Sequence, residues 1–269
     1  MLIIGEKINA SNRHVAEAIV ARNSTYIADM AKAQADAGAD YIDVNVGTGN
    51  QSQQKQVADM EWVVDVVQTA TDRSLSIDSD FPGVIEAALR KYSGAEIMIN
   101  SVNAETGKLD AISRLVTGHN VKIVALAMGA EGIPRSVEKR LAACESIVNH
   151  LARFNINEEQ VYFDPLVLPV SVDSGQALIT LQTIERIKTR YPHSESVIGL
   201  SNISYGLPCR KLINQAFLVM AAHAGLDAAI LDPLDVRTMS LLKAADVLTE
   251  KDPQCRRYTR AYRKGTLVA

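Results

Sequence analysis

The chain has little cysteine and little histidine, which limits the disulfide and metal chemistry that it can carry. Its 269 residues include three cysteines and five histidines. Cys144, Cys209 and Cys255 lie far apart in the chain, which argues against a disulfide framework and against a cysteine-based zinc site. No two histidines stand at the spacing of a metal-binding pair. We therefore predict no protein-bound metal.

The chain also lacks an excess of basic residues and any long apolar run. Its 28 Lys and Arg residues against 31 Asp and Glu residues give a net charge of −3, which leaves no electrostatic footprint for nucleic acid or for an anionic membrane. The apolar start "MLIIG" is far shorter than a signal peptide or a membrane span, and Glu6 follows it at once. We expect a soluble cytoplasmic protein with neither nucleic acid nor a membrane as its partner.

Pro- or Ser-rich linkers are missing as well, and strand-like runs alternate with helix-period segments from end to end. The predicted strands cover residues 2–8, 41–47, 75–79, 96–103, 122–128, 161–168, 196–204 and 228–233. Eight strand–helix units in this length are typical of an α/β fold, the (β/α)8 TIM barrel, here a single domain over residues 1–269. A doubly wound sheet is the alternative, but no glycine-rich phosphate loop opens any helix.

Acids and amides stand where the predicted strands end, at Glu6, Asn9, Asp43, Asn45, Asp78, Asn100, Asp164 and Asn202. In a TIM barrel these carboxyl ends form the active-site face. The alternative is that such residues cap the helices that follow. Several of them lie within or directly after apolar runs, well before the next helix. Buried carboxylates and amides cost several kcal/mol unless they are paired, so we expect a polar ligand among them.

The residue types at this rim indicate what kind of ligand it binds. Carboxylates and amides with few basic residues nearby suit a neutral ligand rich in N–H donors. They suit a phosphate ester poorly, because phosphates are bound by Lys, Arg or helix N-termini. Acids alone could hold Mg²⁺, but amides are weak ligands and no histidine joins the set. A metal-dependent lyase or hydrolase is therefore the less favoured interpretation.

Six motifs in register carry a family resemblance over residues 1–250. They are "GEKIN" (5–9), "YIDVNVG" (41–47), "SIDS" (76–79), "MINSVNAE" (98–105), "FDPLVLP" (163–169) and "GLSNISYGLPCR" (199–210). Their order and their places at strand ends resemble the pterin-binding TIM barrels. The chain looks most like the methyltetrahydrofolate–corrinoid protein methyltransferases and the folate domain of cobalamin-dependent methionine synthase.

The resemblance implies roles for individual residues. Asp164 would accept two hydrogen bonds from the pterin ring, with Asp78 and Asn100 completing the contacts, and Gly199, Ser201 and Arg210 would belong to the same pocket. Asn202 would be the catalytic residue. It would donate a hydrogen bond to N5 of methyltetrahydrofolate as charge develops on that nitrogen during methyl transfer. Structural or supporting roles are expected for Glu6, Asn9, Asp43 and Asn45. The contact made by Tyr205 stays open.

The resemblance also implies the substrates, tetrahydrofolate or methyltetrahydrofolate and a corrinoid. The chain has no Asp-x-His-x-x-Gly motif, so cobalamin would arrive free or on a corrinoid protein, and the family suggests a homodimer. The direction of methyl transfer stays open. Two alternatives remain. Dihydropteroate synthase shares the fold, but its Asn-x-Thr-Pro-Asp-Ser-Phe loop, Ser-x-Lys and Arg-x-His elements are absent. A non-catalytic folate-binding module is the other.

Overall fold

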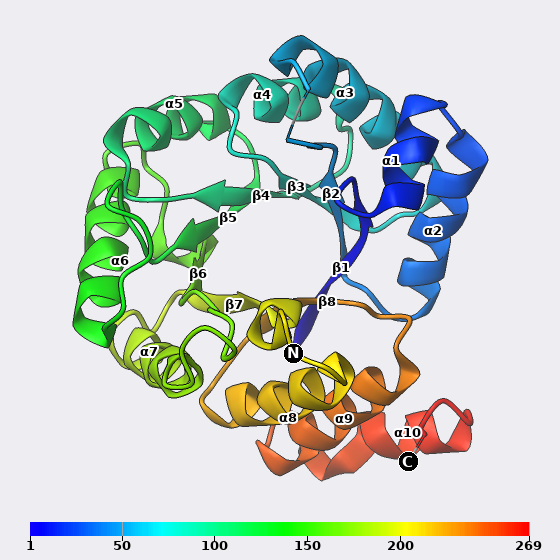
Figure 1. Ribbon diagram of the computed structural model, residues 1–269, viewed down its shortest axis with the longest axis vertical. Helices are drawn as coiled ribbons and strands as arrows, with labels where there is room; N and C mark the ends of the chain where they lie inside the picture. The colour runs from blue at the N-terminus through cyan, green and yellow to red at the C-terminus, as the bar shows by residue number, and fades with distance from the viewer. Residues whose placement is uncertain (50, 269) are drawn as a thin grey trace.

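Eight parallel strands close into a barrel in the computed structural model, which describes residues 1–49 and 51–268. Each strand pairs with the next along the chain, and the last pairs with the first (Figure 1). The strands are β1 (Leu2–Asn9), β2 (Tyr41–Asn45), β3 (Ser74–Asp78), β4 (Ile97–Val102), β5 (Val121–Leu126), β6 (Val161–Asp164), β7 (Glu195–Gly199) and β8 (Ala228–Leu231). The predicted TIM barrel is confirmed.

Helices surround this barrel, as the outer ring of Figure 1 shows, and those that precede β8 connect its strands. They are α1 (Arg13–Val20), α2 (Ser24–Asp36), α3 (Gln53–Ala70), α4 (Pro82–Lys91), α5 (Thr106–Val116), α6 (Val137–Ala152), α7 (Gln176–Arg190), α8 (Arg210–His223), α9 (Val236–Leu248) and α10 (Arg256–Arg263). Short 3₁₀ helices are η1 (Glu158–Gln160), η2 (Leu200–Ser204) and η3 (Pro253–Cys255). The main apolar core lies between the strands and the helices.

A second, smaller apolar cluster fills the inside of the barrel. Its buried members are Ile4, Tyr41, Met98, Val124, Tyr162, Val197 and Ala228. Side chains on a strand alternate between its two faces, so the inward residue two places further along is polar on several strands: Glu6, Asp43, Asn100 and Asp164. The barrel therefore has an apolar plug near the start of its strands and a polar cup at their carboxyl ends.

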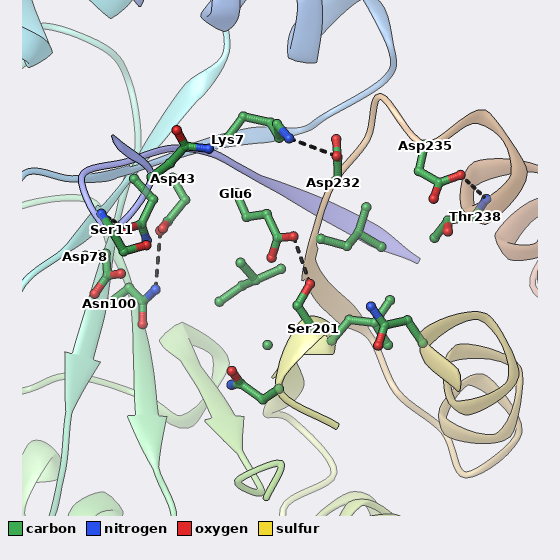
Figure 2. Close-up of a pocket in the computed structure, with 18 of the residues that line it drawn as sticks. Glu6, Lys7, Ser11, Asp43, Asp78, Asn100, Ser201, Asp232, Asp235 and Thr238 are labelled. Carbon is green, nitrogen blue, oxygen red and sulfur yellow. Dashed lines mark hydrogen bonds and ion pairs between the residues drawn. The ribbon is translucent and has the colours of Figure 1, made fainter. Parts of the chain in front are cut away.

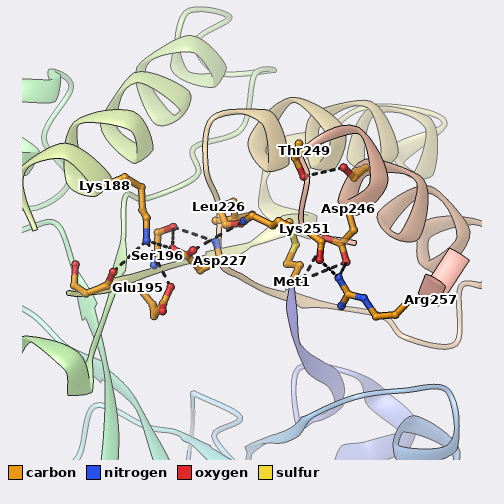
Figure 3. Close-up of polar contacts among 12 residues, drawn as sticks. Met1, Lys188, Glu195, Ser196, Leu226, Asp227, Asp246, Thr249, Lys251 and Arg257 are labelled. Carbon is orange, nitrogen blue, oxygen red and sulfur yellow. Dashed lines mark hydrogen bonds and ion pairs between the residues drawn. The ribbon is translucent and has the colours of Figure 1, made fainter. Parts of the chain in front are cut away.

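Ion pairs and hydrogen bonds tie the chain together at the other end of the barrel (Figure 3). Asp227, just before β8, accepts hydrogen bonds from the backbone N–H and the hydroxyl of Ser196 at 2.8 and 2.9 Å and pairs with Lys188 Nζ at 2.9 Å. The ammonium group of Met1 lies 3.2 Å from Asp246 of α9, which also pairs with Arg257 of α10 at 3.3 Å. These contacts fix the register of β7, β8 and β1 far from the cup.

Most predicted strands end one or two residues later than the structure has them, but two of them are four and five residues too long, and both of these corrections concern the cup. The run 161–168 stops being a strand after Asp164, because Pro165 has no N–H for the ladder and Leu166 has a φ of +70°. The run 196–204 is a strand only to Gly199, and residues 200–204 form η2. In both places the last strand residue, Asp164 or Gly199, is one of the predicted pocket residues.

The helix caps separate the site residues from ordinary capping residues. Side-chain caps come from Asn12, Asn23, Ser52, Ser136 and Asp235. None of the predicted site residues stands at the N-cap position of a described α-helix. The alternative that the acids and amides at the strand ends serve as helix caps is therefore wrong for this set.

Candidate active site

A cavity of about 770 Å³ opens at the carboxyl ends of the strands, and every strand contributes to its wall. Figure 2 shows acids and amides from several strands directed into this space. The lining includes Glu6, Asn9, Asp43, Asp78, Asn100, Asp164, Gly199, Ser201, Asn202 and Arg210. These are ten of the twelve residues that the sequence analysis singled out. Asn45 and Tyr205 do not line it.

Asp43, 3% exposed, holds one side of the cup in place from the cavity floor. Its Oδ1 accepts hydrogen bonds from the hydroxyl of Ser76 at 2.7 Å and from Nδ2 of Asn100 at 3.3 Å. Burial raises the pKa of Asp43 well above its ordinary value, the charge of Asp78 raises it further, and these two hydrogen bonds oppose the rise. Because the Asn100 amide nitrogen is directed at Asp43, its oxygen is left as the acceptor for a cavity ligand.

Asp78 is oriented by a neighbour that stays outside the cavity. Asn45 Nδ2 donates to Asp78 Oδ2 at 2.8 Å, and Asn45 Oδ1 accepts from the backbone N–H of Gly47 at 2.9 Å. Burial raises the pKa of Asp78, while the hydrogen bond from Asn45 lowers it and the charge of Asp80 raises it. The supporting role predicted for Asn45 thus has a geometric basis, because its amide fixes the rotamer of a lining carboxylate.

Asp164 lies at the end of β6 and is anchored on one oxygen. Its Oδ1 accepts the backbone N–H of Leu166 at 2.7 Å. Burial raises the pKa of Asp164 to about 6, against the opposing effects of the Leu166 hydrogen bond and the positive charge of Arg140. At pH 7 the carboxylate form therefore predominates, with Oδ2 and the second lone pair of Oδ1 left to accept hydrogen bonds from a ligand.

Gly199 and Asn202 form a close pair where β7 turns into η2. A Cβ atom built at Gly199 would come within 2.9 Å of Asn202 Nδ2, which is closer than side chains tolerate. The amide of Asn202 therefore lies back over the glycine. Since α8 begins at Arg210 with Cys209 as its N-cap, Asn202 does not cap that helix and its amide is a feature of the cavity wall.

Glu6, Ser201 and Arg210 hold η2 against β1. Ser201 Oγ donates to Glu6 Oε1 at 2.9 Å, and Arg210 Nη2 donates to the Ser201 carbonyl at 2.6 Å. Arg210 Nε also donates to Ser204 Oγ at 3.1 Å. Burial raises the pKa of Glu6, and the hydrogen bond from Ser201 opposes that rise. Ser201 and Arg210 thus shape the loop that carries Asn202.

Asn9 and Tyr205, the remaining predicted residues, occupy different places. Asn9 lines the cavity, where its Oδ1 accepts the backbone N–H of Ser11 at 2.9 Å. Tyr205 is 66% exposed, and its ring lies under the guanidinium of Arg210, 5.9 Å from centroid to Cζ. Tyr205 therefore has no place in the cavity wall.

Sequence reasoning missed two lysines of the cavity wall, Lys7 and Lys211. Lys7 Nζ pairs with Asp232 at 3.0 Å, and Lys211 Nζ pairs with Asp235 at 3.1 Å. Strict alternation would direct Lys7 away from the inside of the barrel, but the register of β1 shifts between Gly5 and Ile8. A glycine within a strand often marks such a bulge, so Gly5 was the available signal. The rim is mainly acidic, but less poor in cations than predicted.

Comparison with known proteins shows which family has this fold and this cavity. Residues 5–232 match the profile of the family described as pterin binding enzyme. The chain belongs to the pterin-binding enzyme family. This confirms the family resemblance drawn from the six motifs, and the matched range contains all of the cavity residues from Glu6 to Asp232.

The sequence of this chain is similar to those of a methyltransferase and a methionine synthase. A methylcorrinoid:tetrahydrofolate methyltransferase of Eubacterium limosum is 36% identical over 99% of this chain and 98% of its own length. A methionine synthase of Mycobacterium tuberculosis is 29% identical over 89% of this chain, but over only 21% of its own length. The similarity to the first protein therefore runs from end to end, while the second contains the matched region as one part.

Solved pterin-binding structures share the architecture at low identity. A dihydropteroate synthase from Coxiella burnetii in complex with pteroic acid superposes with a TM-score of 0.70 at 17% identity, covering 93% of this chain and 94% of the other. A dihydropteroate synthase from Xanthomonas albilineans in complex with 7,8-dihydropteroate superposes with a TM-score of 0.67 at 17% identity, covering 94% of this chain and 93% of the other. At this identity the likeness shows the fold alone.

Two features that mark other classes of site are missing from residues 1–49 and 51–268. No three His, Cys, Asp or Glu side chains come together there as a metal ion would require. Nor does any helix in those ranges have the length and apolar character needed to cross a membrane.

Proposed function

We propose that this protein is a methyltransferase that moves a methyl group between N5 of tetrahydrofolate and the cobalt of a corrinoid. The observation that carries the proposal is the polar cup, in which Asp78 of β3, Asn100 of β4 and Asp164 of β6 face one cavity. The full-length similarity to a methylcorrinoid:tetrahydrofolate methyltransferase supports the same activity. The direction of transfer is not determined by the cavity, because an enzyme lowers the barrier in both directions.

The proposed pterin contacts follow from the donors of its flat ring. The aminopyrimidinone edge presents a ring N–H and an exocyclic NH₂ side by side, and one carboxylate can accept both. Asp164 has this role, since burial and the Leu166 N–H hold it at the cavity wall. Asp78 and the Asn100 oxygen accept further N–H groups around the ring.

The proposed catalytic step depends on Asn202. In the direction from folate to cobalt, the carbon–N5 bond breaks, its electron pair stays on N5, and N5 ends with a proton taken from water or a cavity carboxyl. The methyl carbon becomes bonded to cobalt, whose Co(I) form supplies the electron pair for that bond. Donation of a hydrogen bond from Asn202 Nδ2 stabilises N5 as charge develops there, so it favours the transition state over the ground state. The reverse direction uses the same contact.

The corrinoid is treated as a second substrate that arrives free or on a partner protein. The chain lacks the Asp-x-His-x-x-Gly motif of corrinoid binding, and the cavity opens to the face where a second protein could present the cobalt. A homodimer, on the strength of the family resemblance, belongs to the same proposal, as do the cytoplasmic location and the single domain over residues 1–269 that the sequence led us to expect.

A spectroscopic assay tests the activity and separates it from the two alternatives. Methylcobalamin and tetrahydrofolate are mixed with the protein, and the absorbance of the methyl–cobalt species is followed; the reverse run supplies methyltetrahydrofolate and Co(I) cobalamin. We expect turnover in both runs. Folate binding without turnover would support a binding module, and production of dihydropteroate from its pyrophosphate precursor and p-aminobenzoate would support a dihydropteroate synthase.

A change at Gly199 tests whether the amide of Asn202 must lie where it does. In Gly199→Ala the new Cβ displaces the Asn202 side chain, because Asn202 Nδ2 is the atom nearest to it, at 2.9 Å. We expect kcat to fall by about 10–100-fold, since a 1 Å misplacement can cost about 100-fold, with little change in the melting temperature. Ala at Gly107, where a Cβ meets nothing within 4 Å, is the matched control. Unchanged kcat in Gly199→Ala would contradict the assignment.

The pKa of Asp164 predicts how folate affinity depends on pH. Because its pKa in the ligand-free protein is about 6 and only the carboxylate accepts both pterin hydrogen bonds, affinity is complete above pH 7. Below pH 6 we expect Kd to rise by about tenfold per pH unit. Isothermal titration between pH 5 and pH 8 measures this step, and Asp164→Asn should bind weakly but without it. An identical step in the variant would assign the titration to another group.

A further inference from the structure

Arg140 of α6 is a buried cation bonded only to neutral acceptors. Its side chain is fully buried, and Nε donates to the Pro134 carbonyl at 3.0 Å. Nη1 donates to the carbonyls of Pro165 and Leu166 at 2.7 and 2.9 Å and to Thr180 Oγ1 at 3.3 Å, and Nη2 donates to Gln176 Oε1 at 2.8 Å. Burying a charge costs several kcal/mol without an ionic partner. A contribution to stability alone therefore does not explain why an arginine stands at position 140.

Two of the hydrogen bonds of Arg140 go to the backbone carbonyls that directly follow Asp164, those of Pro165 and Leu166. Leu166 has a φ of +70°, a left-handed conformation that costs a leucine about 1–2 kcal/mol. Its carbonyl accepts from Arg140 Nη1 and from Thr180 Oγ1, both at 2.9 Å. Its N–H donates to Asp164 Oδ1 at 2.7 Å. One side of this residue is thus held by α6 and α7, and the other side holds the carboxylate.

We propose that Arg140 is a positioning residue for Asp164, fixing the Pro165–Leu166 backbone so that the Leu166 N–H anchors the carboxylate toward the cavity. The role of Asp164 in pterin recognition rests on the proposed function, whereas the link from Arg140 to Asp164 rests on the contacts above. The guanidinium does not touch the cavity lining. It acts through a carbonyl, a left-handed residue and one N–H group.

Charge works in the same direction as the geometry. The titratable groups that face Asp164 are Arg140 and Cys144, both on α6. Burial raises the pKa of the Cys144 thiol to about 12, so at neutral pH it is uncharged and Arg140 supplies the positive field. That field and the Leu166 N–H both favour the ionised form of Asp164 against the effect of burial.

The test measures the Asp164 carboxyl itself in the ligand-free protein. Carbon-13 NMR titration, with the resonance assigned by its loss in Asp164→Asn, is run on wild type, Arg140→Gln and Arg140→Lys. In Arg140→Gln we expect the acid dissociation constant of Asp164 to fall by about tenfold, which is one pKa unit. Lysine keeps the charge but loses the fork of donors, so Arg140→Lys should give a smaller shift in the same direction.

Kinetics provide the second readout. For Arg140→Gln we expect the KM for tetrahydrofolate to rise by about threefold at pH 6.5 and to stay nearly unchanged at pH 8.5, with kcat nearly unchanged at both. This follows because a higher Asp164 pKa leaves less carboxylate at the lower pH. A role confined to stability would move neither the pKa nor the pH dependence of KM.

Leu151→Ala is the matched control, because it removes a fully buried side chain from the same helix, roughly 16 Å further along the axis. It should lower stability and leave the Asp164 pKa unchanged. Thr180→Val serves if the Arg140 variants do not fold, since it removes the second donor to the Leu166 carbonyl, and a smaller rise in the same pKa is expected. The proposal is overturned if the folded variants keep the wild-type Asp164 pKa. A shifted pKa in a protein that does not bind folate would leave this link standing and refute the proposed function.

Discussion

Replacing Asn202 with alanine is expected to lower kcat by about 100–1,000-fold, the usual effect of removing one donor that stabilises developing charge. Affinity for methyltetrahydrofolate should fall only a few-fold, because the pterin edge is bound by other residues. The Asn202 amide is held over Gly199 and lies in the cavity wall, so the loss is confined to the hydrogen bond to N5. Single-turnover kinetics with Co(I) cobalamin, together with folate binding by calorimetry, separate the two quantities.

Asn103→Ala is the matched control for this change. Asn103 is also an amide directly after a strand, but its Oδ1 accepts the backbone N–H of Glu105 at 2.8 Å and its side chain is not part of the cavity lining. Its kcat should be normal. If Asn202→Ala instead lost affinity in proportion and kept a normal rate per bound folate, Asn202 would be a binding residue only.

Asp164→Asn is expected to produce the opposite division, with the loss in binding. The amide replaces one acceptor oxygen with an NH₂ group that faces the donors of the pterin ring. Losing about two charge-assisted hydrogen bonds, at about 1.5 kcal/mol each, raises Kd by roughly 100-fold. The rate constant for the bound complex should fall much less, and saturating folate should recover most of the activity.

Asp80→Asn controls for the loss of a negative charge at the same face. Asp80 is exposed, pairs with Lys108 Nζ at 3.0 Å, and does not line the cavity. Its folate affinity should stay near wild type. Equal losses of affinity in Asp80→Asn and Asp164→Asn would mean that general electrostatics, rather than a bidentate contact, accounts for binding.

Much of the cup could be predicted from single strands. Asp78, Asn100 and Asp164 each interrupt or end an apolar run, and parallel strands bring such positions to one face. Asn100 and Asp164 face the inside of the barrel because each lies two residues after an inward apolar residue, Met98 or Tyr162. Local pattern and fold therefore determine where these side chains point.

The rest depends on contacts between segments far apart in the chain. Lys7 enters the cavity wall through a bulge in β1 that α2 helps to fix, since Gln34 Oε1 accepts the Lys7 backbone N–H at 2.9 Å. Arg140 belongs to a helix, and its relation to Asp164 appears only when α6 and the loop after β6 lie together. Neither relation leaves a periodic trace in the sequence.

A structure of the protein with bound methyltetrahydrofolate tests the central claim most directly. We expect the pterin ring in the cup, its ring N–H and NH₂ both on the Asp164 carboxylate, and Asn202 Nδ2 within hydrogen-bond distance of N5. A folate bound elsewhere, or a pterin ring in the cup with N5 out of reach of Asn202, would contradict the account.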